Sequence, residues 1–158
     1  MKTSRAVVII LLIAVVSVSI YAWSRKNIEV ADVTPAPVGE SDIKGCYVAG
    51  NSKDVYTLNI KSQIGGAVAG TLAFKNFEKD SSSGTYVATY DDGILLGNYS
   101  FQSEGMNSVM QVVFKKSGDD FVRGYGELNA DGTKFTNLST IIYDMSPLGV
   151  FKNTPCTS

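Results

Sequence analysis

The chain has 158 residues, with 14 Lys and Arg against 15 Asp and Glu, so its net charge at pH 7 is −1. Residues 41–158 hold 10 basic and 12 acidic side chains, which leaves no basic patch of the kind that binds nucleic acid. The chain has no His, the usual general base at neutral pH and a common zinc ligand. We therefore expect no enzyme, no catalytic residues, no metal and no cofactor.

Residues 6–23 form an uncharged run of 18 residues, from Ala6 to Trp23, preceded by Lys2 and Arg5. As a helix this run would span about 27 Å, close to the thickness of a bilayer core. A cleaved signal peptide is the alternative, but the usual Ala-x-Ala cleavage pattern is missing. We expect an uncleaved signal-anchor, a single transmembrane helix with residues 1–5 in the cytoplasm.

Residues 24–40 read as a flexible linker. They contain the run Thr34-Pro35-Ala36-Pro37 and show no sustained hydrophobic periodicity, which is typical of an extended tether. Residues 41–158 then remain for one folded domain outside the cytoplasm.

Two cysteines, Cys46 and Cys156, lie near the two ends of this domain. The termini of a small domain are often close in space, so we predict a disulfide between them. Two buried free thiols are the alternative. Because disulfides persist in oxidising compartments, this pairing places the domain in the periplasm or cell exterior and the N-terminus inside.

Alternating apolar residues predict a series of strands from residue 54 onward. Residues 54–61 and 68–75 form a hairpin around Gly65-Gly66, and residues 84–116 form a three-stranded meander with a tight turn at Asp91-Asp92-Gly93. Residues 121–128, 134–138 and 140–143 look like further short strands, and Pro147, Gly149 and Pro155 break the tail. We expect an all-β fold, a small antiparallel meander barrel of about eight strands. A β-sandwich is the alternative.

Glycine recurs on the apolar strand faces where core side chains would lie, at Gly70, Gly97, Gly124 and Gly126. It would let strands bend sharply as a small sheet closes on itself. Close backbone approach by a ligand is the alternative interpretation.

Few residues suggest catalysis, metal binding or ligand binding. The pairs Asp91-Asp92 and Asp119-Asp120 offer oxygen ligands for Ca²⁺, but they lie in predicted turns and match no EF-hand loop. Glu78 and Glu104 could act as an acid and base pair only if their strands were neighbours. Tyr56, Tyr99 and Phe101 share the parity of the core residues, so we interpret them as packing. Alternatively, these three rings line a site for a small apolar ligand.

Several short motifs occur in order along residues 44–156: Gly45-Cys46-Tyr47, Asp92-Gly93-x-Leu95, Tyr99-x-Phe101-x-Ser103-Glu104-Gly105 and Val112-x-Phe114-Lys115-Lys116. Their order resembles small extracytoplasmic domains of bacterial envelope lipoproteins of uncharacterised function. Those proteins carry a lipid-anchored Cys after the signal, whereas this chain has a hydrophobic segment there. The resemblance implies a place in the envelope and assigns no catalytic residue.

Together these features predict a membrane-anchored, non-enzymatic binding or interaction module of the envelope. Its partner would be an envelope protein or a small apolar ligand, and not nucleic acid. The alternative is a lipocalin-like carrier or sensor of a small apolar ligand held inside the barrel.

Overall fold

The structure, a computed structural model, describes residues 41–156. The expected cytoplasmic N-terminus 1–5, membrane anchor 6–23 and linker 24–40 lie outside the described residues, as do residues 157–158. Within the part of the chain that is described, no helix has the length and apolar character needed to cross a membrane.

The regular structure of the described chain consists of β-strands and one short 3₁₀ helix. Its elements are β1 (Gly45–Gly50), β2 (Val55–Ile64), β3 (Ala67–Lys75), β4 (Ser82–Asp91), β5 (Ile94–Ser103), β6 (Met106–Ser117), β7 (Asp120–Tyr125), η1 (Leu138–Thr140), β8 (Ile142–Tyr143) and β9 (Val150–Thr154).

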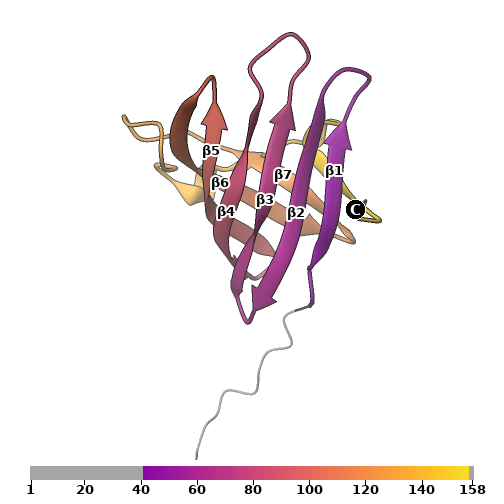
Figure 1. The fold of residues 1–158 in the computed structure, drawn as a ribbon. Helices are drawn as coiled ribbons and strands as arrows, with labels where there is room; N and C mark the ends of the chain where they lie inside the picture. Colours follow the sequence, from indigo (N-terminus) through magenta and orange to yellow (C-terminus); the bar gives the residue numbers. More distant parts are fainter. Residues whose placement is uncertain (1–40, 157–158) are drawn as a thin grey trace, which may run out of the picture. The chain divides into compact units, whose positions relative to one another are not determined.

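Eight of these strands form a closed antiparallel barrel (Figure 1). Each strand from β1 to β7 pairs with the next, and β9 closes the barrel by pairing with both β7 and β1. The closing register sets Val150 opposite Val122 and Lys152 opposite Val48. The two-residue β8 pairs with the last part of β7. The all-β barrel expected from the sequence is confirmed.

The connections between strands alternate between two ends of the barrel. At one end, called the near end, β1 begins and β9 stops, and the turns after β2, β4 and β6 lie there. The described chain enters at this end, where Gln63 of β2 donates to the Ser41 carbonyl and accepts from the Ile43 amide. The opposite end, called the far end, holds the connections after β1, β3 and β5 and the last residue of β7. In Figure 1 the arrows of β1, β3 and β5 point to it.

The core follows the predicted alternation. Leu58, Leu72, Leu95 and Tyr99 are fully buried inside the barrel, as the period of two requires. Aromatic rings fill much of the interior, because bulky side chains are needed to fill a barrel of this size. They meet edge to face, with centroid distances of 5.0 Å for Tyr47–Phe121, 5.2 Å for Phe114–Phe151 and 6.3 Å for Tyr90–Phe121.

The predicted turn between β4 and β5 is also confirmed. Asp92 and Gly93 are its two central residues and have φ angles of 46° and 76°. Two positive φ angles suit the twist of a two-residue hairpin, and Asp and Gly tolerate them better than other residues.

The C-terminal third differs from the sequence-based expectation. The predicted strand 121–128 ends at Tyr125, and residues 134–143 contain η1 and β8 in place of two strands. The cause is local hydrogen bonding, which competes with strand pairing. The Asn129 side chain accepts from the amides of Thr133 and Lys134, and the Asn137 side chain accepts from that of Ser139.

Residues in this C-terminal segment also cover the outer face of β6 and β7. Val113 and Val122 are 2% and 3% exposed but lie outside the interior core. A Cβ added to Gly124 would lie 2.5 Å from the Ile141 side chain and 2.7 Å from that of Val113. Gly124 therefore allows this segment to pack against the barrel wall. The expectation that Gly124 occupies a core position is wrong, whereas Gly70 and Gly97 do alternate with buried core residues.

Candidate functional site

Tyr56, Tyr99 and Phe101, the three predicted ligand-lining residues, belong to one aromatic cluster in the far half of the barrel. Phe74 joins them, with centroid distances of 5.0 Å to Tyr56 and 5.8 Å to Tyr99. Phe101 stacks on Tyr99 at 4.8 Å. Tyr99 is fully buried, while Tyr56 and Phe101 are partly buried against the core. The structure thus brings the three rings together as neighbours in a packed layer.

The two tyrosine hydroxyls of this cluster are engaged. The Tyr56 hydroxyl donates to Asn76 Oδ1 at 2.8 Å, and that of Tyr99 donates to Ser82 Oγ at 3.3 Å. Burial raises the pKa of both phenols above the ordinary value. Both groups are therefore neutral at physiological pH and serve as hydrogen-bond partners.

Arg123 lies against this cluster and was not singled out by the sequence patterns. Its guanidinium carbon is 4.0 Å from the ring centroid of Phe74 and 4.6 Å from that of Tyr125, so the group lies between two aromatic rings. Burial lowers the pKa of Arg123, and nearby Tyr125 and Tyr56 oppose that shift. In β7, Arg123 lies on the same face as Phe121 and Tyr125, but the alternation does not identify that face, because Val122 and Gly124 on the other face are also buried.

The guanidinium of Arg123 has no ion-pair partner within residues 41–156. The ion pairs there are Lys44–Asp42 and Lys152–Asp120. The negative charge of Asp144 is close enough to favour a higher pKa for Arg123. However, Asp144 Oδ1 accepts from the Ser146 amide at 2.8 Å, and Oδ2 accepts from the Ser146 hydroxyl at 3.0 Å. The nearby carboxylate is thus occupied within its own loop.

The backbone of Arg123 forms hydrogen bonds with both ends of the loop made by residues 144–149. Its amide donates to the Gly149 carbonyl at 2.8 Å, and its carbonyl accepts from the Asp144 amide at 3.0 Å. In the middle of the loop, the Pro147 carbonyl accepts from the Gly50 amide at the end of β1 at 3.0 Å. Residues 144–149 therefore fill the gap between β1 and β7 at the far end.

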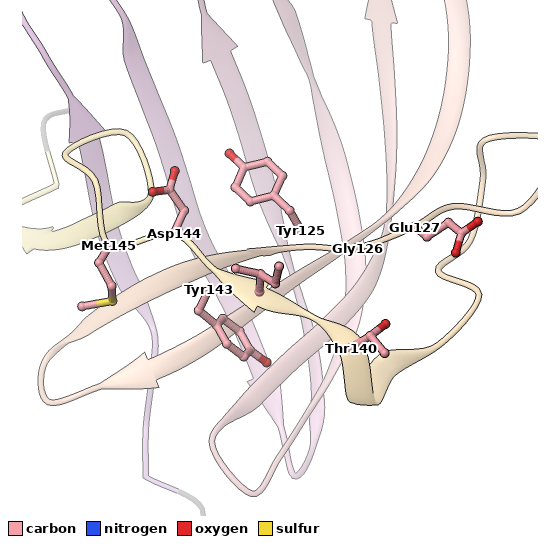
Figure 2. A pocket seen from close by; sticks show the side chains of 8 residues that line it. Tyr125, Gly126, Glu127, Thr140, Tyr143, Asp144 and Met145 are labelled. Atoms are coloured by element: carbon pink, nitrogen blue, oxygen red, sulfur yellow. The ribbon is translucent and has the colours of Figure 1, made fainter.

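An open hollow of about 780 Å³ lies beside Tyr125 (Figure 2). Tyr125 and Asp144 project to the same side of the β8 ribbon, and Tyr143 projects to the opposite side. The lining of the hollow combines acidic, hydroxyl and apolar groups from the end of β7, the residues after it, and β8 with its flanking residues. The lining residues are Tyr125, Gly126, Glu127, Thr140, Ile142, Tyr143, Asp144 and Met145.

Exposed apolar side chains collect at the far end of the barrel. Ten large apolar residues in the described chain are exposed. Six of them lie at the far end, either at the end of a strand, in a connection between strands, or in the segment that pairs with the end of β7. We call these six residues the far rim: Val55, Phe77, Met106, Tyr125, Ile142 and Met145. At the near end only Ile64 belongs to this exposed set. The far end therefore exposes more large apolar side chains than the near end.

The other predicted candidates have structural roles or remain isolated. Cys46 and Cys156 form the predicted disulfide. Among residues 41–156 no cluster of three acidic, Cys or His side chains is arranged to hold a metal ion. Glu78 and Glu104 are exposed, and each adopts a positive φ, 55° and 49°, in a separate far-end turn. Asp120 accepts from the Lys152 side chain and the Asn153 amide, which ties β7 to β9.

Comparison of the chain with protein-family models, with curated proteins and with solved structures gives no match.

Proposed function

We propose that this protein is a non-enzymatic binding module of the bacterial cell envelope that engages its partner with the far end of the barrel. Residues 6–23 would hold it in the membrane, with the folded domain in the periplasm or cell exterior. The disulfide supports that compartment, since such bonds persist where conditions are oxidising. The resemblance to envelope lipoprotein domains supports the same location.

The distribution of exposed apolar residues carries this proposal. Ile142 and Met145 are 76% and 71% exposed, and both line the hollow beside Tyr125. Exposed apolar surface of this kind is a common feature of interaction sites. The described chain begins at the near end, beside the disulfide, so the far end is the part of the barrel most distant from the first described residue.

The packing of the aromatic cluster favours the far rim over the barrel interior as the binding surface. Tyr99 contacts Phe74 on one side and Phe101 on another and is fully buried. A carrier that held an apolar ligand inside the barrel would have to displace these contacts.

A photocrosslinking experiment on the full chain tests the proposal. The photoreactive residue p-benzoylphenylalanine replaces Met145 in one variant and Ile64 in another, and each variant is expressed in bacteria that export the chain. Ile64 is a matched control, because it is 82% exposed and apolar but lies at the near end. We expect a discrete crosslinked product from position 145 and none from position 64. Adding Ile142→Ser should reduce the yield at position 145.

Equal crosslinking at the two positions would contradict a far-end interaction, as would the absence of any product at position 145. Protein levels and disulfide formation, followed on non-reducing gels, show whether each variant reached the envelope folded.

A further inference from the structure

We propose that Arg123 is the anion-recognition residue of the far end, and that its ligand is a small carboxylic acid with an apolar body. The inference rests on the proposed function in one respect, namely that the far end is the binding end. It adds the chemistry of the ligand and the residue that recognises it.

The guanidinium of Arg123 lies against two aromatic rings. Removing a charged group from water is costly unless it is paired or hydrogen-bonded. Here the rings of Phe74 and Tyr125, at 4.0 Å and 4.6 Å, offset part of that cost through cation–π contacts. Within residues 41–156, no protein carboxylate forms an ion pair with the N–H donors of this guanidinium. The side chain is half-buried and so keeps access to solvent.

Backbone hydrogen bonds hold Arg123 in place. The backbone of Arg123 in β7 forms hydrogen bonds with the backbones of Asp144 and Gly149. The Asp144 carboxylate accepts two hydrogen bonds from Ser146 and forms no ion pair with the guanidinium. The guanidinium is thus held in place without an ion-pair partner among residues 41–156, as a preformed anion site requires.

The planar shape and single charge of the Arg123 guanidinium favour a carboxylate as the anion. A planar guanidinium matches a carboxylate through two parallel hydrogen bonds. A carboxylate carries one negative charge and balances the single charge of Arg123, whereas phosphate near neutral pH carries more charge, which would add to that of nearby Asp144. The apolar body of the acid would rest on Tyr125, Ile142 and Met145, which are exposed and line the hollow, and Tyr125 is one of the two rings that contact the guanidinium.

Nuclear magnetic resonance of the full chain in detergent micelles gives a direct readout. The sequence contains only Arg5, Arg25 and Arg123, so selective ¹⁵N-arginine labelling produces three Nε–H signals, and Arg123→Lys identifies the one from Arg123. The chain is titrated with hexanoate, hexanol and inorganic phosphate. We expect hexanoate to shift the Arg123 signal in a saturable manner. Hexanol and phosphate should shift it far less, and the signals of Arg5 and Arg25 serve as internal controls.

Calorimetric titration with hexanoate separates charge from geometry. Arg123→Lys keeps the charge but loses the planar pair of donors, so affinity should fall by about tenfold. Lys115→Gln is the matched control, since Lys115 is another cation over an aromatic ring, 5.6 Å from the Tyr143 centroid, but is exposed on the outer surface. It should leave affinity unchanged. Thermal unfolding checks that both variants are folded.

Arg123→Lys is used only to assign the NMR signal, and the titration itself is made on the unchanged chain. The titration therefore decides the proposal even if Arg123→Lys is unstable. The proposal is overturned if hexanoate produces no saturable shift of the Arg123 signal, or if hexanol or phosphate shifts it equally. Its failure is distinct from that of the proposed function. Crosslinking at position 145 without a hexanoate response would contradict only the proposed carboxylic acid ligand. A hexanoate response without crosslinking would contradict only the proposed interaction with a partner.

Discussion

Cys46 and Cys156 are joined by a disulfide with their Cα atoms 5.2 Å apart, although 110 residues separate them in the chain. Cys46 lies in β1 opposite Thr154, the last residue of β9. The bond therefore fastens the seam at which the first and last strands of the barrel meet. It also encloses nearly the whole folded domain in one covalent loop.

Removing this bond should destabilise the domain strongly. For the double variant Cys46→Ser/Cys156→Ser, the chain-entropy model gives a loss of about 4 to 5 kcal/mol in the free energy of unfolding for a loop of this length. Because small domains have only about 5 to 15 kcal/mol in total, the variant should be partly unfolded at 37 °C. Urea unfolding of the full chain in detergent, followed by tyrosine fluorescence, measures the difference.

Thr154→Val is a control for this experiment. It removes a hydrogen bond of 3.3 Å from Thr154 Oγ to the Cys46 carbonyl and leaves the disulfide intact. The expected loss is about 1 kcal/mol. If the two variants lost the same amount, the disulfide would not be the main fastening of the seam.

Much of the barrel could be predicted from the sequence because its strands bury one face only. In β5, Leu95 and Tyr99 are buried while Asn98 and Ser100 between and beside them are exposed. This alternation is visible in the sequence and identifies the inward face. The disulfide was also predictable, because a closed barrel brings the ends of its chain together.

The parts that could not be predicted depend on long-range pairing or on burial of both strand faces. In β7, Phe121 faces the interior and Val122 is covered from outside, so the alternation no longer identifies the core face. The closing strand β9 is short, follows Pro147 and Gly149, and is fixed by backbone pairing with distant β1 and β7. The setting of Arg123 between Phe74 and Tyr125 needs the barrel to be closed first, so no local pattern reveals it.

Gly70→Ala should also be strongly destabilising. A Cβ at this position would clash with the Asn59 carbonyl oxygen and lie 2.9 Å from the Tyr86 hydroxyl. The first contact is with backbone of the paired strand β2, so relief requires the two strands to move apart. We expect a loss of about 3 kcal/mol, at the upper part of the range for overpacked cores. The midpoint of urea unfolding gives the value.

Ala69→Ser provides the comparison for Gly70→Ala. Ala69 is adjacent on β3, and its side chain faces the other side of the sheet and is only partly buried. This substitution should change the unfolding free energy by no more than about 0.5 kcal/mol. A similar loss in both variants would argue that β3 tolerates no change at all, and that the close approach at Gly70 is not the specific cause.

Stability should fall at alkaline pH because buried tyrosines resist ionisation. Burial raises the pKa of Tyr47, Tyr86 and Tyr99 in the folded state, and the pKa of Tyr86 lies well above its usual range. In the unfolded chain these groups titrate near a pKa of about 10. A folded-state pKa above the unfolded value means that the contribution to stability is complete below about pH 10 and is lost as the pH rises through the folded-state pKa.

Urea unfolding between pH 8 and pH 12 measures this dependence, and absorbance of tyrosinate near 295 nm shows how many phenols ionise before the domain unfolds. Tyr86→Phe is the informative variant. It should cost about 1 kcal/mol at neutral pH, where it removes a long hydrogen bond of 3.4 Å to the Asn59 carbonyl. It should also make the decline above about pH 10 shallower, because one fewer buried phenol must ionise on unfolding. An unchanged slope in Tyr86→Phe would mean that the buried hydroxyl of Tyr86 does not contribute to the alkaline transition.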